Sequence, residues 1–158
     1  MHYAGRYATT RAKLAAYLMR KIRERGWDGA EAPEVEALIT RFAELRYVDD
    51  AAYASMCTAS LTRRGYGARR VVENLRAAGI EESEREEAHR QAERKKWQAA
   101  ETFARKRRIG PYASQAADRD MQQKQIAAFL RAGHDFELAR RFVGAGPGET
   151  VGEEEEWD

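Results

Sequence analysis

The sequence predicts an all-α protein made of tandem three-helix repeats that form an elongated curved array. Of the 158 residues, 34% are charged and only three are proline, and Ala, Arg, Glu and Leu dominate, as in helical proteins. Apolar residues recur at helical spacing, and no segment alternates like a strand. The helix-stopping glycines Gly26, Gly79 and Gly133 lie 53 and 54 residues apart. Units of this size bury their apolar faces by stacking on their neighbours.

This spacing divides the chain into four parts. The first repeat covers residues 1–46, with its opening helix partly missing, and the second and third cover 47–96 and 97–143. Residues 144–158 are expected to form a disordered acidic tail, because they are rich in Gly and Glu. Six of the 26 acidic residues lie there, so residues 1–143 carry 20 acidic against 28 basic side chains. A basic body favours an acidic or polyanionic partner, with which the tail could compete.

The first repeat is predicted to hold two clear helices. Thr9 or Thr10 caps the first, which runs to about Arg25 and ends at Gly26. Pro33 suits the first position of the second helix. An apolar stripe then marks that helix most strongly, with residues Val35, Leu38, Ile39, Phe42 and Leu45.

The second repeat is predicted to open at a pair of aspartates. Asp49 is a good N-cap, and Asp50 lies in the positive first turn of a helix that runs to Arg64. We expect that helix to bury Tyr53, Met56 and Leu61.

A two-glycine turn around Tyr66 follows that helix. Gly65 ends the helix with a positive φ, and Gly67 starts the next one, which stops at Gly79. A capping box of Ser83 and Glu86 then opens a nearly all-polar helix to about residue 96, which is expected to bridge solvent.

The third repeat is predicted to begin at Trp97. Its first helix packs Ala100, Phe103 and Ala104 and is broken by Gly110 and Pro111. Asp118 caps a helix to Arg131 that packs Met121, Ile126, Phe129 and Leu130. Asp135 caps the last helix, which packs Phe136, Phe142 and Val143.

Basic residues make up the two candidate partner-binding sites. The first surrounds Tyr66 and consists of Arg63, Arg64, Arg69, Arg70 and Arg76, opposed only by Glu73. Arginine binds phosphate and carboxylate through its planar fork, whereas Tyr66 is equally suited to a core position. The second candidate is Arg105, Lys106, Arg107 and Arg108, for which a solvated helix face is the simpler interpretation.

Catalytic, metal and cofactor sites are not indicated. The adjacent carboxylates of Asp49 and Asp50 are better explained by helix capping than by acid–base work. The three histidines share no ligand spacing with Cys57, and no phosphate-binding loop or Cys-x-x-Cys motif occurs. The single cysteine excludes an internal disulfide, and no apolar stretch is long enough to span a membrane. We expect a cytoplasmic monomer without catalytic residues, metal or cofactor.

Three motifs resemble those of the regulatory RecX family. They are Tyr47-Val48-Asp49-Asp50-Ala51-Ala52-Tyr53-Ala54, Arg64-Gly65-Tyr66-Gly67, and Leu75 followed by Gly79-Ile80. The resemblance is strong over residues 6–80 and weaker over 97–143; Val48 stands where leucine is commoner, and the glutamate run is extra. It implies three tandem three-helix repeats that bind the RecA filament on single-stranded DNA. It further implies inhibition of ATPase, strand-exchange and coprotease activities in DNA repair and recombination.

Two functional hypotheses therefore remain open from the sequence. The first is a protein module that spans adjacent RecA subunits and also meets DNA phosphates. The second is a helix-turn-helix-like nucleic-acid binder whose helix after Gly67 enters a major groove. Asn74 is the only amide on that helix, so phosphate contact with single-stranded or duplex DNA would lack sequence specificity.

Overall fold

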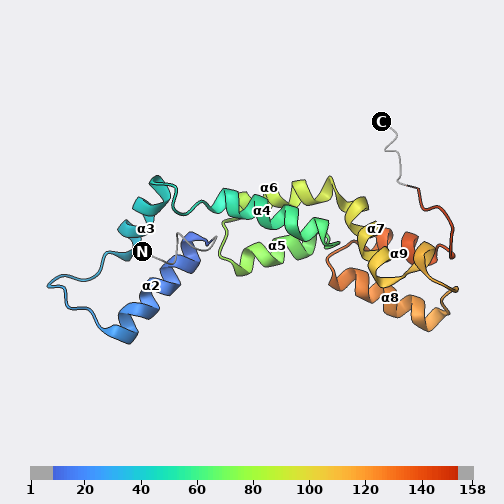
Figure 1. Ribbon diagram of the computed structural model, residues 1–158, viewed down its shortest axis with the longest axis horizontal. Coiled ribbons are helices and arrows are strands. Elements are labelled where there is room, and N and C mark those ends of the chain that lie inside the picture. The colour runs from blue at the N-terminus through green and yellow to red at the C-terminus, as the bar shows by residue number, and fades with distance from the viewer. Residues whose placement is uncertain (1–8, 153–158) are drawn as a thin grey trace.

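The computed structural model describes residues 9–152, whose regular elements are all helices, with no strand among them (Figure 1). The all-α prediction is confirmed. In chain order the elements are α2 (Arg11–Arg25), α3 (Val35–Glu44), α4 (Asp50–Arg63), α5 (Ala68–Ala77), α6 (Glu82–Glu93), α7 (Lys96–Arg107), the 3-10 turn η1 (Gly110–Tyr112), α8 (Arg119–Arg131) and α9 (Phe136–Gly144).

The helices form three groups in a row along the long axis of the molecule (Figure 1). Helices α2 and α3 lie at one end, α4 to α6 in the middle and α7 to α9 at the other end, so the predicted elongated repeat array is confirmed. Each group has its own apolar cluster, centred on Leu14 and Ile39, on Val71 and Leu75, and on Phe129. Because no single core unites residues 9–152, the groups are held together at their joints.

The helix ends follow the local sequence signals closely. Four predicted N-caps accept a hydrogen bond from the backbone N–H three residues on, at 2.7–3.1 Å, namely Thr10, Asp49, Asp118 and Asp135. The three predicted helix-stopping glycines have positive φ of 79°, 74° and 92°, namely Gly26, Gly79 and Gly133. These predictions are confirmed, because a cap depends on a few neighbouring residues.

Two predicted helix starts are wrong. Pro33 precedes Glu34, which is the N-cap of α3, so the proline lies outside the helix. The capping box of Ser83 and Glu86 does not form, because α6 begins after Glu81 and places Ser83 inside the first turn. Ile80 is buried immediately after Gly79, and the N-cap of α6 is Glu81, two residues earlier than the predicted cap Ser83.

Several residues expected in the core are exposed. Met56 is 51% exposed and Phe136 is 56% exposed, and Leu38, Leu45, Met121 and Leu130 are exposed as well. Helix α4 instead buries its face of small residues, Ala54, Thr58 and Thr62. Small side chains let helices approach closely, which also explains why the polar helix α6 packs through Ala88 and Ala92 instead of bridging solvent.

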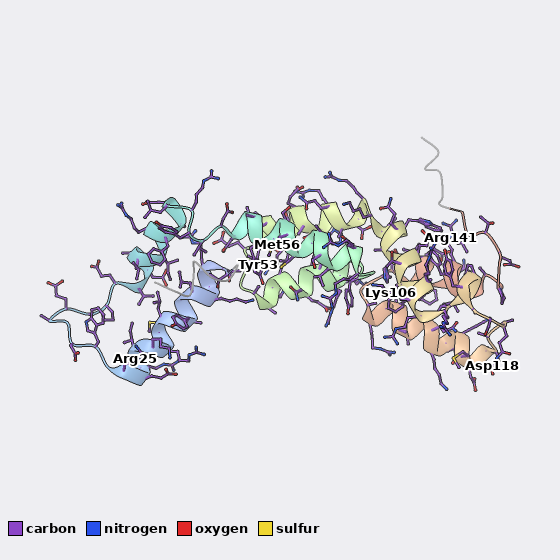
Figure 2. All side chains as sticks on the ribbon, in the orientation of Figure 1. Arg25, Tyr53, Met56, Lys106, Asp118 and Arg141 are labelled. Carbon is purple, nitrogen blue, oxygen red and sulfur yellow. The ribbon has the colours of Figure 1, made fainter. Side chains whose placement is uncertain are left out.

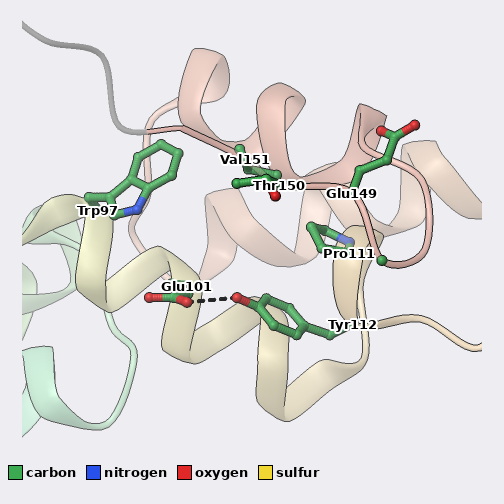
Figure 3. A pocket seen from close by; sticks show the side chains of 8 residues that line it. Trp97, Glu101, Pro111, Tyr112, Glu149, Thr150 and Val151 are labelled. Atoms are coloured by element: carbon green, nitrogen blue, oxygen red, sulfur yellow. Dashed lines mark hydrogen bonds between the residues drawn. The ribbon is translucent and has the colours of Figure 1, made fainter.

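The segment 145–152 lies against the third group of helices, in contrast to the expected disorder from residue 144. The backbone N–H of Gly148 donates to the carbonyl of Pro111 at 2.9 Å. Val151 packs against the core cluster beside Trp97 (Figure 3). The remaining acidic residues of the expected tail, at positions 153–158, lie outside the described residues.

Candidate partner-binding surface

The turn around Tyr66 forms the joint between the second and third helix groups. The backbone N–H of Gly67 donates to the carbonyl of Ala132 at 2.9 Å, and that of Arg69 donates to the carbonyl of Gly133 at 3.2 Å. From the other side, Nε2 of His134 lies 2.9 Å from the carbonyl oxygen of Gly65. The connection between α4 and α5 is therefore bonded to the connection between α8 and α9.

Both glycines of this turn are required by close packing. Gly65 has a φ of 94°, and a Cβ added there would lie 3.0 Å from the backbone nitrogen of Phe103. A Cβ at Gly67 would lie 2.3 Å from the carbonyl oxygen of Gly133. Tyr66, between them, is half-buried against the aromatic core of the third group. The turn therefore packs the second helix group closely against the third.

An equivalent joint connects the first and second groups. Oγ1 of Thr10 donates to the carbonyl of Ala78 at 2.6 Å, and Ala78 precedes Gly79 just as Ala132 precedes Gly133. The backbone N–H of Arg11 also donates to Oδ1 of Asp50 at 2.9 Å. Asp50 therefore links two repeats, beyond its predicted place in its own helix, and burial there raises the pKa of its carboxyl group.

The two basic segments of the sequence meet at the joint around Tyr66. Arg63 and Arg64 end α4, Lys106 and Arg107 end α7, and all four side chains are exposed. Nζ of Lys106 donates to the carbonyl oxygen of Arg64 at 3.0 Å, which brings the two helix ends together. Figure 2 places Lys106 between the middle and the C-terminal helices. We call these four residues the basic joint surface.

Aromatic rings of the joint orient two of these cations. The guanidinium of Arg64 lies over the ring of Tyr66 at 5.4 Å, and that of Arg107 lies over the ring of Phe103 at 5.7 Å. Stacking on a ring leaves the N–H edge of a guanidinium free to bind a carboxylate or phosphate. Within residues 9–152, Arg63, Arg64 and Arg107 form no ion pair with a carboxylate. Their charge is therefore available to a partner.

The other basic candidates do not belong to this cluster. Arg70 lies 3.5 Å from the carboxylate of Glu73, and Arg108 ends α7 in a left-handed conformation. Arg69 and Arg76 are exposed on α5, where a separation of seven residues places them on one face about 10 Å apart.

Arg105 belongs to a separate polar cluster beside η1. Its Nη2 donates to Glu101 at 2.9 Å, and the hydroxyl of Tyr112 donates to the same carboxylate oxygen at 2.7 Å (Figure 3). The Tyr112 hydrogen bond lowers the pKa of Glu101 and raises that of Tyr112. A cavity of about 290 Å³ is lined by Glu101, Tyr112, Trp97 and the segment 148–151. Sequence reasoning missed the cluster, since no periodic pattern relates residues 101 and 112.

His134 is a further residue that sequence reasoning passed over. Its position in the sequence shows only that it lacks metal-ligand spacing, whereas in the fold it is 2% exposed and bonded to the turn of another repeat. Among residues 9–152, no three His, Cys, Asp or Glu side chains are grouped to hold a metal ion. No helix in that same part of the chain is long and apolar enough to cross a membrane.

A row of three helix groups joined through their turns defines a helical-repeat protein. A family model described as "RecX, second three-helix domain" matches residues 49–88. Regulatory protein RecX of Myxococcus xanthus is 33% identical over 155 residues, covering 93% of this chain and 83% of the relative. Regulatory protein RecX of Agrobacterium fabrum is 32% identical over 138 residues, covering 85% and 73%. The chain therefore belongs to the RecX family of regulatory proteins.

Two solved structures share the fold. A crystal structure of regulatory protein RecX matches with a TM-score of 0.66 at 22% identity, over 90% of this chain and 66% of that one. The structure of RecX from Lactobacillus salivarius matches with a TM-score of 0.63 at 18% identity, over 90% and 88%. The likeness at such low identity shows that the repeat architecture is common to all three chains.

Proposed function

We propose that this protein binds the filament that RecA forms on single-stranded DNA and inhibits its ATPase, strand-exchange and coprotease activities. The observation that carries the proposal is the basic joint surface, where cations from two repeats converge. Membership of the RecX family supplies the partner. We further propose that the protein acts as a monomer and without catalytic chemistry, since its relatives are named regulatory proteins.

The architecture suits a filament because both are elongated. Helix groups arranged in a row spread their contacts over several subunits, and each joint sets the angle between neighbouring groups. The basic joint surface lies between the second and third groups, where it is able to meet carboxylates of the filament or phosphates of the DNA inside it. Like charges concentrated without acidic partners repel one another, and an anionic partner relieves that repulsion.

The direct test is DNA-dependent ATP hydrolysis by the cognate RecA, with filament nucleation separated from extension. We expect inhibition at substoichiometric protein. The double variant Arg64→Glu with Arg107→Glu should inhibit about tenfold more weakly, the effect of roughly 1.4 kcal/mol of lost binding. The matched control changes Arg119 and Lys124 to glutamate, which reverses the same number of charges outside the joint. Both residues are exposed on α8, and this variant should inhibit normally.

Two results would contradict the proposal. One is an unchanged rate of ATP hydrolysis at every ratio of protein to RecA. The other is equal inhibition by the joint variant and its control, with both folded by circular dichroism. Arg69→Glu with Arg70→Glu then tests whether the surface extends along α5.

The nucleic-acid hypothesis rests on the exposed pair Arg69 and Arg76 of α5. A major-groove helix would bind naked duplex at least as well as RecA-coated single-stranded DNA, with a steep dependence on salt. A binding competition between these two DNA forms distinguishes the hypotheses, and preference for the coated strand supports filament binding.

A further inference from the structure

His134 is the one histidine among residues 9–152 that lies buried between two repeats. It follows Gly133 in the connection between α8 and α9, and its Nε2 bonds to the carbonyl of Gly65, in the turn of the preceding repeat. That carbonyl follows Arg64 directly, so the bond attaches the end of α4 to the third repeat. His134 therefore fixes the turn beside which the basic joint surface is assembled.

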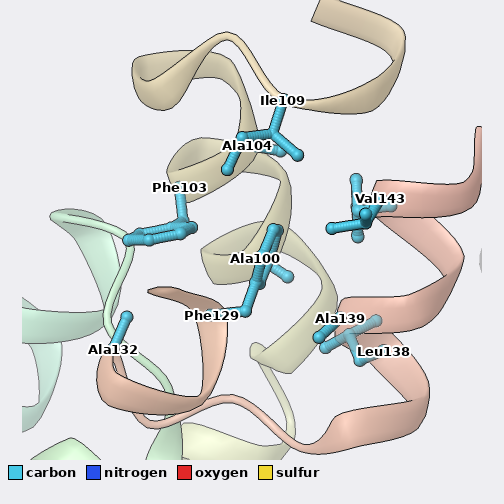
Figure 4. Close-up of a cluster of buried hydrophobic side chains, with 10 residues drawn as sticks. Ala100, Phe103, Ala104, Ile109, Phe129, Ala132, Leu138, Ala139 and Val143 are labelled. Atoms are coloured by element: carbon cyan, nitrogen blue, oxygen red, sulfur yellow. The ribbon is translucent and has the colours of Figure 1, made fainter. Parts of the chain in front are cut away.

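The surroundings of the imidazole define its protonation state. Rings of Phe103 and Phe129 lie with centroids 5.6 and 5.4 Å from it, within the apolar cluster shown in Figure 4. Nδ1 is buried and has no hydrogen-bond partner. Because a carbonyl oxygen only accepts, Nε2 carries the proton, and the neutral ring leaves Nδ1 as an unprotonated nitrogen. Burial lowers the pKa of His134.

Burial opposes a second proton on this ring. The bond to the Gly65 carbonyl and the charge of Asp135 at the start of α9 favour the protonated ring, but by less than burial disfavours it. That carboxylate already accepts the N–H of Leu138 at 2.7 Å. The elements packed at this joint carry further charged side chains of both signs, namely Arg63 and Arg64 of α4, Arg69, Arg70 and Glu73 of α5, Glu101, Lys106 and Arg107 of α7, Arg131 of α8 and Glu137 of α9.

We propose that His134 is a positioning residue whose neutral ring holds the second repeat on the third, and that its protonation releases this joint. A proton on Nδ1 would be buried without an acceptor, between aromatic rings. A charged ring that leaves this apolar pocket for water gives up its Nε2–H bond to the Gly65 carbonyl. Arg63 and Arg64 are then free to move relative to Lys106 and Arg107. The regulation of filament binding by pH rests on the proposed function, whereas the release of the joint does not.

The direction of the pH effect follows from linkage. The unfolded chain takes up the proton near the ordinary histidine pKa of about 6.5, whereas the folded chain takes it up only at lower pH. The joint is therefore fully stable above that value. Its stability falls as the pH drops below it and stops falling once the folded ring is also protonated.

The first experiment measures folding alone. Urea unfolding followed by circular dichroism at about pH 7.5 and about pH 5.5 brackets the ordinary histidine pKa. His134→Gln keeps an N–H donor but does not titrate, so it should remove most of the fall in the midpoint between the two pH values. The control His89→Gln alters an exposed residue near Glu93 and should retain the fall. An equal fall in the wild type and His134→Gln would overturn the proposal.

The second experiment observes the ring itself in the folded protein. Nitrogen-detected NMR of the imidazoles should show His134 as the neutral ring with its proton on Nε2, titrating below the ordinary histidine pKa of about 6.5. Titration of His134 at that ordinary value would show an accessible ring and would also overturn the proposal. Because neither readout includes RecA, both results stand even where filament inhibition is absent.

The third experiment links the joint to the partner. Inhibition of RecA ATPase should weaken from about pH 7.5 to about pH 6 for wild type, and His134→Gln should lose less inhibition over the same interval. Comparing variants in the same reaction cancels the pH dependence of RecA itself. An identical loss of inhibition in the wild type and His134→Gln would refute the regulation of filament binding by pH. The release of the joint by protonation would then be judged from the first two experiments.

Discussion

Replacing Gly67 with alanine tests whether the joint holds the repeats together. The φ of Gly67 is −80°, which any residue adopts, so the substitution introduces no backbone strain. Its Cβ would instead lie 2.3 Å from the carbonyl oxygen of Gly133, whereas real Cβ contacts essentially never fall below 3.0 Å. The full cost therefore arises between the two repeats.

The magnitude follows from the contacts that must change. Relieving the overlap requires a shift of roughly 1 Å between backbones, and overpacking of this kind costs about 1–3 kcal/mol. The shift also breaks the hydrogen bond from Gly67 to Ala132, which contributes about 0.5–1.5 kcal/mol. We expect a loss of about 2–4 kcal/mol in the free energy of unfolding.

The matched control is Gly144→Ala. Gly144 is the last residue of α9, and a Cβ added there would meet nothing within 4 Å. Alanine favours helix there by up to about 1 kcal/mol, so the control should be neutral or stabilising. Urea unfolding of both variants measures the difference. Stability of Gly67→Ala within about 0.5 kcal/mol of the wild type would refute the packing argument.

Two further variants test the other joint and the tail. Thr10→Ala removes both the cap of α2 and the bond to Ala78 and should lower the free energy of unfolding by about 1–3 kcal/mol. Thr10→Ser keeps both bonds and is the control in the same urea unfolding experiment. Equal losses of stability in the two variants would contradict this account. Removing residues 153–158 deletes five acidic side chains but keeps the packed Val151, so binding to RecA filaments should tighten if the tail competes for the basic joint surface. Equal or weaker binding would dismiss that role.

Features set by nearby residues were predicted well. Thr10, Asp49 and Asp135 cap helices because a side-chain oxygen reaches an N–H only three residues away. The positive φ at Gly79 and Gly133 likewise follows from glycine at a helix end.

Burial was predicted less well, because it depends on which face meets another helix. Met56 is apolar but exposed, since α4 packs through Ala54 and Thr58 on its other side. Val151 lies in a segment of disorder-like composition, yet a partly buried position beside Trp97 exists for it. Composition reports how much apolar surface a segment offers, whereas packing depends on the complementary surface elsewhere.

The candidate site shows the same division. The sequence singled out arginines near Tyr66 and the basic end at residues 105–108 as two separate sites. The fold joins Arg64 to Lys106 and Arg107 and directs Arg105 toward Glu101 instead. Arg64 and Lys106 are 42 positions apart, and no local rule relates them.

By itself the sequence determined the helices, most of their caps and their glycine stops, because each depends on contacts within one or two turns, and the spacing of those stops indicated the repeat. Only the tertiary structure decided how one repeat sits on the next. A carbonyl at Gly65, an imidazole at His134 and the absence of a Cβ at Gly67 meet there from segments nearly seventy residues apart. Such contacts arise from shape complementarity between packed surfaces, and the basic joint surface owes its position to them.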